Sequence, residues 1–236
     1  MKRVLNIAAA ICFISINIAN AQFAVPGDNP ASVRWYQIET DYYKIIYPKG
    51  LDSLARIYGR DLEGYRIPVG RTAGYAPGTM TRTKTPVVLF AFNAKSNGLV
   101  SWAPKRMELY TTPSADDAEA AAWHRHLVIH ESRHVAQMQG GLSDLFRPMK
   151  YVVGEMFNGF VAGLYPRIEM LEGDAVVAET ALTRSGRGRS ADFMNYYMIA
   201  FDNGDFRNWE KWRFGSQRNY YLNQYAAGYL MTGGVR

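Results

Sequence analysis

The chain has 236 residues, which is enough for one large domain or two small ones. Its composition is 48% hydrophobic, 14% aromatic and 20% charged, a globular profile that excludes a disordered or fibrous protein. The net charge of +6 comes from 27 basic and 21 acidic residues. No block of consecutive like charges occurs, so nucleic-acid binding is not predicted.

Residues 1–21 have the features of a signal peptide. A basic start is followed by the apolar stretch Val4–Ile18, and Ala19–Ala21 supplies the small-any-small pattern that signal peptidase reads. We predict cleavage between Ala21 and Gln22, and export to the periplasm, the cell surface or the medium. The alternative is a retained membrane anchor, but the apolar stretch is short for a span of ~20 residues.

The only cysteine, Cys12, lies within this predicted signal peptide. Ile11 precedes it, where a lipoprotein signal would have a small residue. The mature chain is therefore expected to contain neither a thiol nor a disulfide, which excludes cysteine chemistry as its function.

The mature chain begins with a Pro/Gly-containing leader, residues 22–32, followed by a strand-rich part, residues 33–113. Short runs of β-branched and aromatic residues predict strands, and apolar residues at three- and four-residue steps predict a helix. In chain order we predict strands at Val33–Ile38 and Tyr42–Tyr47, a helix at Leu51–Tyr65, a loop at Gly70–Thr85, a strand at Pro86–Phe92, a turn at Asn97 and Gly98, and a strand at Arg106–Thr111.

Residues 114–236 have a helical pattern. Ser114 with two following aspartates favours a helix start, and the absence of Gly and Pro predicts one long helix over Ala118–Gln139, ended by two glycines. Further helices are predicted at Leu145–Phe160, Ile168–Thr183, Ala191–Phe201 and Asn219–Met231. Strands followed by helices indicate an α+β fold.

All four histidines of the chain lie on the predicted long helix, and His130 to His134 form the motif H-E-x-x-H. Side chains four apart on a helix share one face, so His130 and His134 can bind one cation, and zinc is the metal this motif predicts. Glu131 projects to the side and can reach a water at the metal as a general base. The alternative is a chance match in a buried helix that binds no metal.

A zinc site needs a third protein ligand. No cysteine remains in the mature chain, and His126 lies about 12 Å from His134 along a straight helix at 1.5 Å per residue, too far to share an ion. The third ligand is therefore expected to be a carboxylate. The downstream candidates are Asp144, Glu155, Glu169, Glu172, Asp174 and Glu179.

The pattern E-G-x-A at Glu172, downstream of H-E-x-x-H, resembles the second motif of the gluzincin zinc metallopeptidases, which include thermolysin and the zinc aminopeptidases. The resemblance implies that Glu172 is the third ligand and that Glu179, seven residues later, supports a zinc-bound histidine. It also implies a tyrosine that stabilises the oxyanion. Tyr225, in the pattern Y-x-x-G, matches best, with Tyr221 and Tyr229 as alternatives.

The segment Tyr43–Pro48 resembles the start of peptidase-MA-like domains of secreted bacterial proteins. This implies a zincin-like α+β domain over residues 33–236, with a mixed N-terminal sheet whose edge strand lies over the active-site helix and a mostly helical C-terminal part. Arg106–Thr111 is expected to be that edge strand. Some relatives continue into β-rich regions, so the resemblance leaves open a longer parent protein of which this domain is a truncated piece.

The sequence thus predicts an exported zinc metallopeptidase that acts on peptides or proteins. The alternative is a peptidase-like binding or assembly module with little or no hydrolysis. Met107 and Glu108 match two letters of the aminopeptidase pattern G-x-M-E-N, too little to choose between endo- and exopeptidase. The arginine-rich segment Arg184–Arg189 is interpreted as a solvated loop, in preference to a carboxylate-binding loop.

Overall fold

The computed structural model describes most of the chain after the predicted leader. The predicted signal peptide and three candidate residues, Asp144, Glu155 and Tyr221, lie outside the described residues. No described helix combines the length and apolar character needed to cross a bilayer. The described residues are 29–75, 83–102, 104–115, 121–140, 149–154, 156–157, 161, 167–216 and 223–234.

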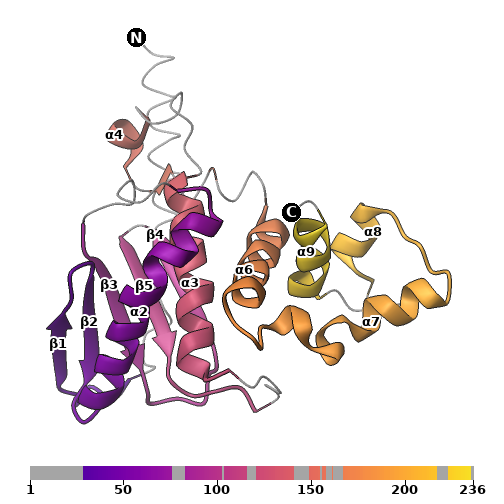
Figure 1. Cartoon of the computed structure of the whole chain (residues 1–236). Coiled ribbons are helices and arrows are strands. Elements are labelled where there is room, and N and C mark those ends of the chain that lie inside the picture. The colour runs from indigo at the N-terminus through magenta and orange to yellow at the C-terminus, as the bar shows by residue number, and fades with distance from the viewer. Residues whose placement is uncertain are drawn as a thin grey trace.

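Five strands of the described residues form one mixed sheet in the order β1-β2-β3-β5-β4 (Figure 1). The pairs β1/β2 and β4/β5 are antiparallel, whereas β2/β3 and β3/β5 are parallel. With the helices that follow, the chain has an α+β fold. The strands are β1 (Trp35–Glu39), β2 (Tyr43–Pro48), β3 (Thr85–Phe90), β4 (Gly98–Trp102) and β5 (Lys105–Tyr110).

The edge strand near the helical part is β4, so the prediction that Arg106–Thr111 forms this edge is wrong. That segment is β5, which lies between β3 and β4, and its side chains Met107 and Leu109 are completely buried. Gly98, expected to form a turn with Asn97, is instead the first residue of β4. A short edge strand leaves few unpaired backbone groups for another chain to pair with, so five residues suffice there.

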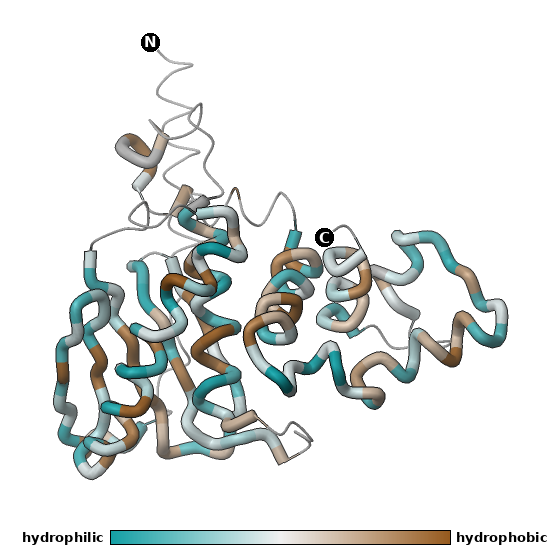
Figure 2. Tube along the Cα trace, in the orientation of Figure 1, coloured by the Kyte–Doolittle hydropathy of each residue, from teal (hydrophilic) through white to brown (hydrophobic). Residues whose placement is uncertain are grey.

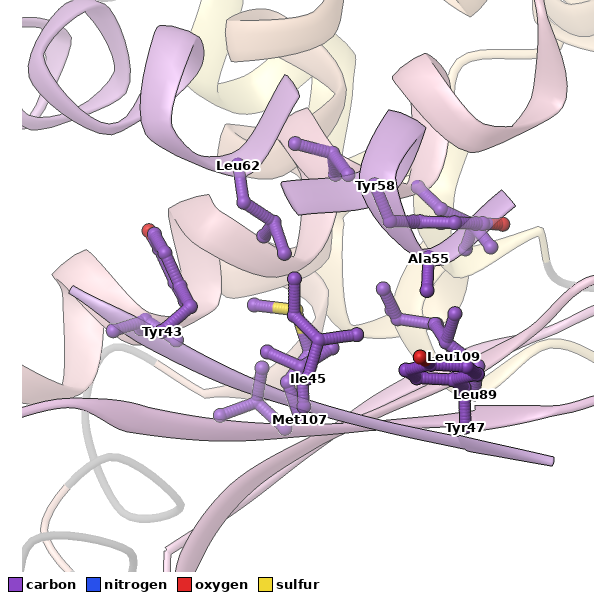
Figure 3. Close-up of a cluster of buried hydrophobic side chains, with 14 of the residues drawn as sticks. Tyr43, Ile45, Tyr47, Ala55, Tyr58, Leu62, Leu89, Met107 and Leu109 are labelled. Carbon is purple, nitrogen blue, oxygen red and sulfur yellow. The ribbon is translucent and has the colours of Figure 1, made fainter. Parts of the chain in front are cut away.

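Two helices, α2 (Asp52–Thr72) and α3 (Trp123–Gly140), cover one face of the sheet (Figure 1). Helix α2 continues through Pro68 and ends seven residues beyond the predicted Tyr65. Figure 3 shows the resulting core, in which side chains of β2, β3 and β5 point at the underside of α2. Its fully buried members include Ile45, Leu89, Met107, Leu109, Ala55 and Leu62.

The helical part follows the sheet and lies beside α3 (Figure 1). The predictions for Ile168–Thr183 and Ala191–Phe201 are confirmed, and a short helix at Trp209–Phe214 was not predicted. Figure 2 shows hydrophobic turns along α6 and hydrophobic residues alternating with hydrophilic ones along the strands. The elements are α4 (Met149–Val153), α6 (Ile168–Leu182), the 3₁₀ turn η1 (Arg187–Arg189), α7 (Ala191–Asp202), α8 (Trp209–Phe214) and α9 (Gln224–Gly233).

Helices α6 and α9 pack with their backbones in direct contact. A Cβ atom on Gly173 would overlap the backbone of Gly228, and one on Gly228 would overlap the carbonyl oxygen of Glu169. Only glycine at both positions allows this approach. The glycines of E-G-x-A and Y-x-x-G therefore have a packing role, which brings α9 and its Tyr225 against the helix that carries Glu172.

Candidate metal centre

Three side chains converge where α3 meets α6. His130 Nε2 lies 3.1 Å from His134 Nε2 and 3.0 Å from Glu172 Oε2, and His134 Nε2 lies 3.3 Å from the same oxygen. The two imidazoles come from successive turns of α3, and the carboxylate comes from the second turn of α6. Of the four candidate carboxylates that the structure describes, Glu172 is the one that meets both histidines.

The opposite ring nitrogen of each histidine has a hydrogen-bond acceptor. His130 Nδ1 faces Glu179 Oε1, and His134 Nδ1 lies 2.8 Å from Gln137 Oε1. Arg187 Nη2 also lies 3.0 Å from His130 Nδ1, but the ionised Glu179 carboxylate can only accept a hydrogen bond, as can the Gln137 oxygen. We therefore assign the proton of each neutral imidazole to Nδ1, which leaves a lone pair on each Nε2. With Glu172 Oε2, three lone-pair donors point at one another.

These three side chains could hold a cation. Without a metal, a proton has to take its place. Burial alone would lower the pKa of His134, but the hydrogen bond from its ring to Glu172 and the charges of Glu131 and Glu172 raise it to about 9. A tetrahedral zinc ion with bonds of ~2.0–2.1 Å separates its ligand atoms by roughly 3.3 Å, close to the observed spacing. The donor set and its spacing fit zinc.

Glu131 lies beside this triad and beneath the edge strand. It is 3% exposed, and within the described part of the chain its Oε2 atom has no hydrogen-bond partner. Burial raises the pKa of its carboxyl, opposed by the charges of His130 and His134. A Cβ atom on Gly98 of β4 would overlap the Glu131 carboxylate in its present position, so glycine lets the edge strand pass close over this side chain.

Glu179 supports His130 from the side opposite the triad. It is 1% exposed, and it also contacts His126 Nε2 at 3.0 Å and Arg187 Nη2 at 2.7 Å. Burial would raise the pKa of Glu179, but the charge of Arg187 and the contacts with the two histidines hold it well below its usual value. His126, His130 and Glu179 could also surround a metal ion. The Arg187 guanidinium already neutralises Glu179, so we interpret this group as a support of His130.

The interpretation of Arg184–Arg189 as a solvated loop is wrong for Arg187. Its side chain is 24% exposed and packs over the ring of Tyr225 at 4.9 Å in addition to its pairing with Glu179. A run of arginines and glycines carries no local signal for a buried partner located eight residues earlier. The close packing of η1 on α6 produced this contact: a Cβ atom on Gly186 would overlap the backbone of Thr180.

Tyr225 lies at the same site, with its ring 6.1 Å from the ring of His130. Burial, together with the charge of Glu172, raises the pKa of its hydroxyl. The alternative Tyr229 packs instead against Phe193 and above Gly188, away from the triad. Among the described tyrosines that the sequence proposed, Tyr225 is therefore the one at the site.

The remaining titratable candidates have other partners. His124 Nδ1 pairs with Asp61 at 2.9 Å, and Asp174 pairs with Arg133 at 2.6 Å. Glu108, in the faint aminopeptidase match, pairs with Arg106 on β5 rather than lining the site. Because these histidine and carboxylate side chains pair with other residues, the sequence alone could not tell which of the candidates form the triad.

A pocket of about 440 Å³ opens above the triad. Its walls come from β4 on one side and from α3 and α6 on the other. Apolar side chains line it beside the polar group. They include Leu99, Val100, Leu127, Met138, Ile168 and Leu171.

Comparison of the chain with protein-family models, with curated proteins and with solved structures gives no match. The chemistry of the site therefore has to be inferred from its own residues.

Proposed function

We propose that the chain is an exported zinc metallopeptidase of the gluzincin type with a zincin-like fold. The observation that carries this proposal is the triad itself: three lone-pair donors 3.0–3.3 Å apart, with Glu131 buried beside them. His130, His134 and Glu172 would hold zinc, and Glu179 would support His130. The proposal of export rests on the sequence of residues 1–21 alone.

Zinc, when bound, supplies a Lewis acid that acidifies a water molecule and polarises a carbonyl group. Glu131 then accepts a proton from the attacking water and passes it to the leaving amine nitrogen. Its burial favours this exchange, because a raised pKa makes the carboxylate a better proton acceptor. The Tyr225 hydroxyl would donate a hydrogen bond to the oxyanion that develops on the scissile carbonyl.

The edge strand supplies a way to hold a peptide. Among the described residues, strand β4 pairs with β5 on one side only, and its residues 98–100 form a wall of the pocket. An extended peptide can add to such an edge through main-chain hydrogen bonds. A peptide lying there would pass over Glu131, since Gly98 lies directly above that carboxylate.

The decisive experiment measures zinc content and peptide turnover of the exported protein, for the wild type and for Glu131→Gln. The amide cannot accept a proton, so we expect turnover to fall by ~10²–10⁴-fold while the zinc content and the melting temperature stay at wild-type values. Glu210→Gln on α8 is the matched control and should leave turnover unchanged. A wild type that binds zinc but cleaves no peptide in a diverse library would favour the binding-module alternative.

A further inference from the structure

The amide group of Gln137 is held in one orientation at the junction of α3 and α6. Its Nε2 donates to the carbonyl oxygen of Leu171 at 2.9 Å and to Asp174 Oδ2 at 2.8 Å. Both partners are acceptors, so the nitrogen of the amide has to face them. The Oε1 atom consequently faces His134 Nδ1, 2.8 Å away.

Asp174 is itself fixed by a buried arginine. Arg133 is 2% exposed, and its Nε and Nη2 atoms donate to the two carboxylate oxygens of Asp174 at 2.6 and 2.9 Å. The same guanidinium donates through Nη1 to Thr72 Oγ1 on α2 at 3.1 Å. A paired two-bond contact of this kind fixes the plane of the carboxylate, and so the direction from which Gln137 is held.

We propose that Gln137 is a positioning residue for the metal centre: oriented by Asp174 and Arg133, it accepts the Nδ1 proton of His134 and so holds that ring with its Nε2 lone pair toward the metal. The relay of Arg133, Asp174 and Gln137 joins α2, α3 and α6. It rests on the proposed zinc site and adds to it a determinant of zinc affinity. Glu179 does the same for His130, so each histidine ligand has its own acceptor.

The test compares zinc affinities of the full protein, measured by competition with a chromophoric chelator. Gln137→Met has nearly the same shape but offers no acceptor, and we expect zinc affinity to fall by ~10–100-fold. Gln139→Met, the same exchange two residues later on α3, should bind zinc like the wild type. Equal affinities of the two variants would overturn the proposal.

A second pair of variants separates the acceptor from the packing of the amide. Gln137→Glu and Gln137→Met are each combined with Asp174→Asn, because a carboxylate at position 137 would otherwise lie against that of Asp174. The glutamate keeps an oxygen for His134, whereas the methionine does not. We expect the combination with Gln137→Glu to bind zinc at least tenfold more tightly than the one with Gln137→Met. If both combinations bind equally weakly, Gln137 acts through packing alone and the proposal is wrong.

Nuclear magnetic resonance of the zinc-loaded protein provides a signature that general destabilisation does not produce. In the wild type, the Nδ1 protons of both His130 and His134 should be protected from exchange with solvent. In Gln137→Met only the His134 proton should lose protection, with His130 as the internal reference. Loss of both protons, or of neither, would contradict the relay.

The outcomes also distinguish this inference from the proposed function. Zinc binding that depends on Gln137, without peptide turnover, would support the relay and refute the peptidase. Peptide turnover together with a zinc affinity that does not depend on Gln137 would support the peptidase and refute the relay. A wild type that binds no zinc would refute both.

Discussion

The sheet with α2 and α3 differs from the helical part α6–α9 in what holds it together. In the first region, large apolar side chains such as Ile45, Leu89 and Met107 are completely buried in one continuous core. In the second, the described apolar clusters are small: one surrounds Tyr197 and Trp212, and in another Ala178 of α6 meets residues of α2 and α3. Large apolar residues there stay outside, with Phe206 and Phe214 77% and 70% exposed.

The helical part compensates through close backbone packing and polar contacts. Glycines let α6 and α9 touch, and the ion pair of Arg133 with Asp174 ties α6 to α3. The candidate metal centre lies across the same junction, with two ligands from the well-packed region and one from the other. If zinc binds there as proposed, its binding should stabilise the helical part, whereas the stability of the sheet region should depend little on metal.

The largest expected effect is a loss of zinc affinity on removal of the ligand that α6 contributes. Glu172→Ala should lower zinc affinity by at least ~100-fold, since it removes one of three protein ligands. Glu169→Ala, one turn earlier on α6, should change zinc affinity far less, although its side chain is also buried. Titration with zinc in the presence of a competing chelator measures both. Equal losses would show that α6 contributes packing and no ligand.

The next effect concerns pH. An ordinary histidine pKa of ~6.5 predicts that protons compete with zinc mainly below about pH 6. In this structure the competition extends to higher pH, because the pKa of His134 is raised to about 9 in the metal-free fold. Zinc affinity should therefore keep rising by up to about tenfold per pH unit from pH 6.5 to 9.

The same titration has a consequence for stability. Protonated His134 stabilises the metal-free fold fully below pH ~6.5, and this stabilisation is lost as the pH rises through about 9. The difference in melting temperature between zinc-loaded and chelator-treated protein should widen over that window. A difference that is constant from pH 6 to 9 would contradict the buried His134–Glu172 contact.

A smaller effect is expected on the stability of the protein when the packing of α9 on α6 is disturbed. Gly228→Ala forces α9 away from α6 and should cost ~1–3 kcal/mol of unfolding free energy. Because the shift also moves Tyr225, peptide turnover should fall more than zinc affinity does. Chemical denaturation and zinc titration of the same variant check this. Unchanged stability would mean that the two helices are not in backbone contact.

The smallest effect is the counterpart in the sheet region. Gly64 lies inside α2, and a Cβ atom added there would meet no described atom within 4 Å beyond the neighbouring backbone of its own helix. Gly64→Ala should therefore stabilise the protein by about 0.5–1 kcal/mol, through the better helix propensity of alanine. It should leave zinc affinity unchanged. Gly228→Ala should thus lower the unfolding free energy and Gly64→Ala should raise it, because only the first glycine lies at a backbone contact between two helices.

Several elements were predictable because their signals are local. The helical pattern of Ile168–Thr183 identified α6 to within one residue, and the run of β-branched and aromatic residues Tyr42–Tyr47 identified β2 with the same accuracy. The relative placement of His130, Glu131 and His134 follows from the geometry of one helix and does not depend on residues elsewhere in the chain. Helix α8 escaped prediction because its six residues are too few to show a period, and only the cap by Asn208 marks its start.

The sequence by itself therefore determined the α+β order, the helix that bears H-E-x-x-H and a short set of candidate carboxylates. Only the tertiary structure decided that Glu172 meets the histidines, that β4 rather than β5 is the edge strand, and that side chains of α6 orient Gln137 and Arg187. Periodicity and spacing are properties of neighbouring residues. Strand order and buried polar contacts depend on residues far apart in the chain, whose meeting is set by the packing of the whole molecule.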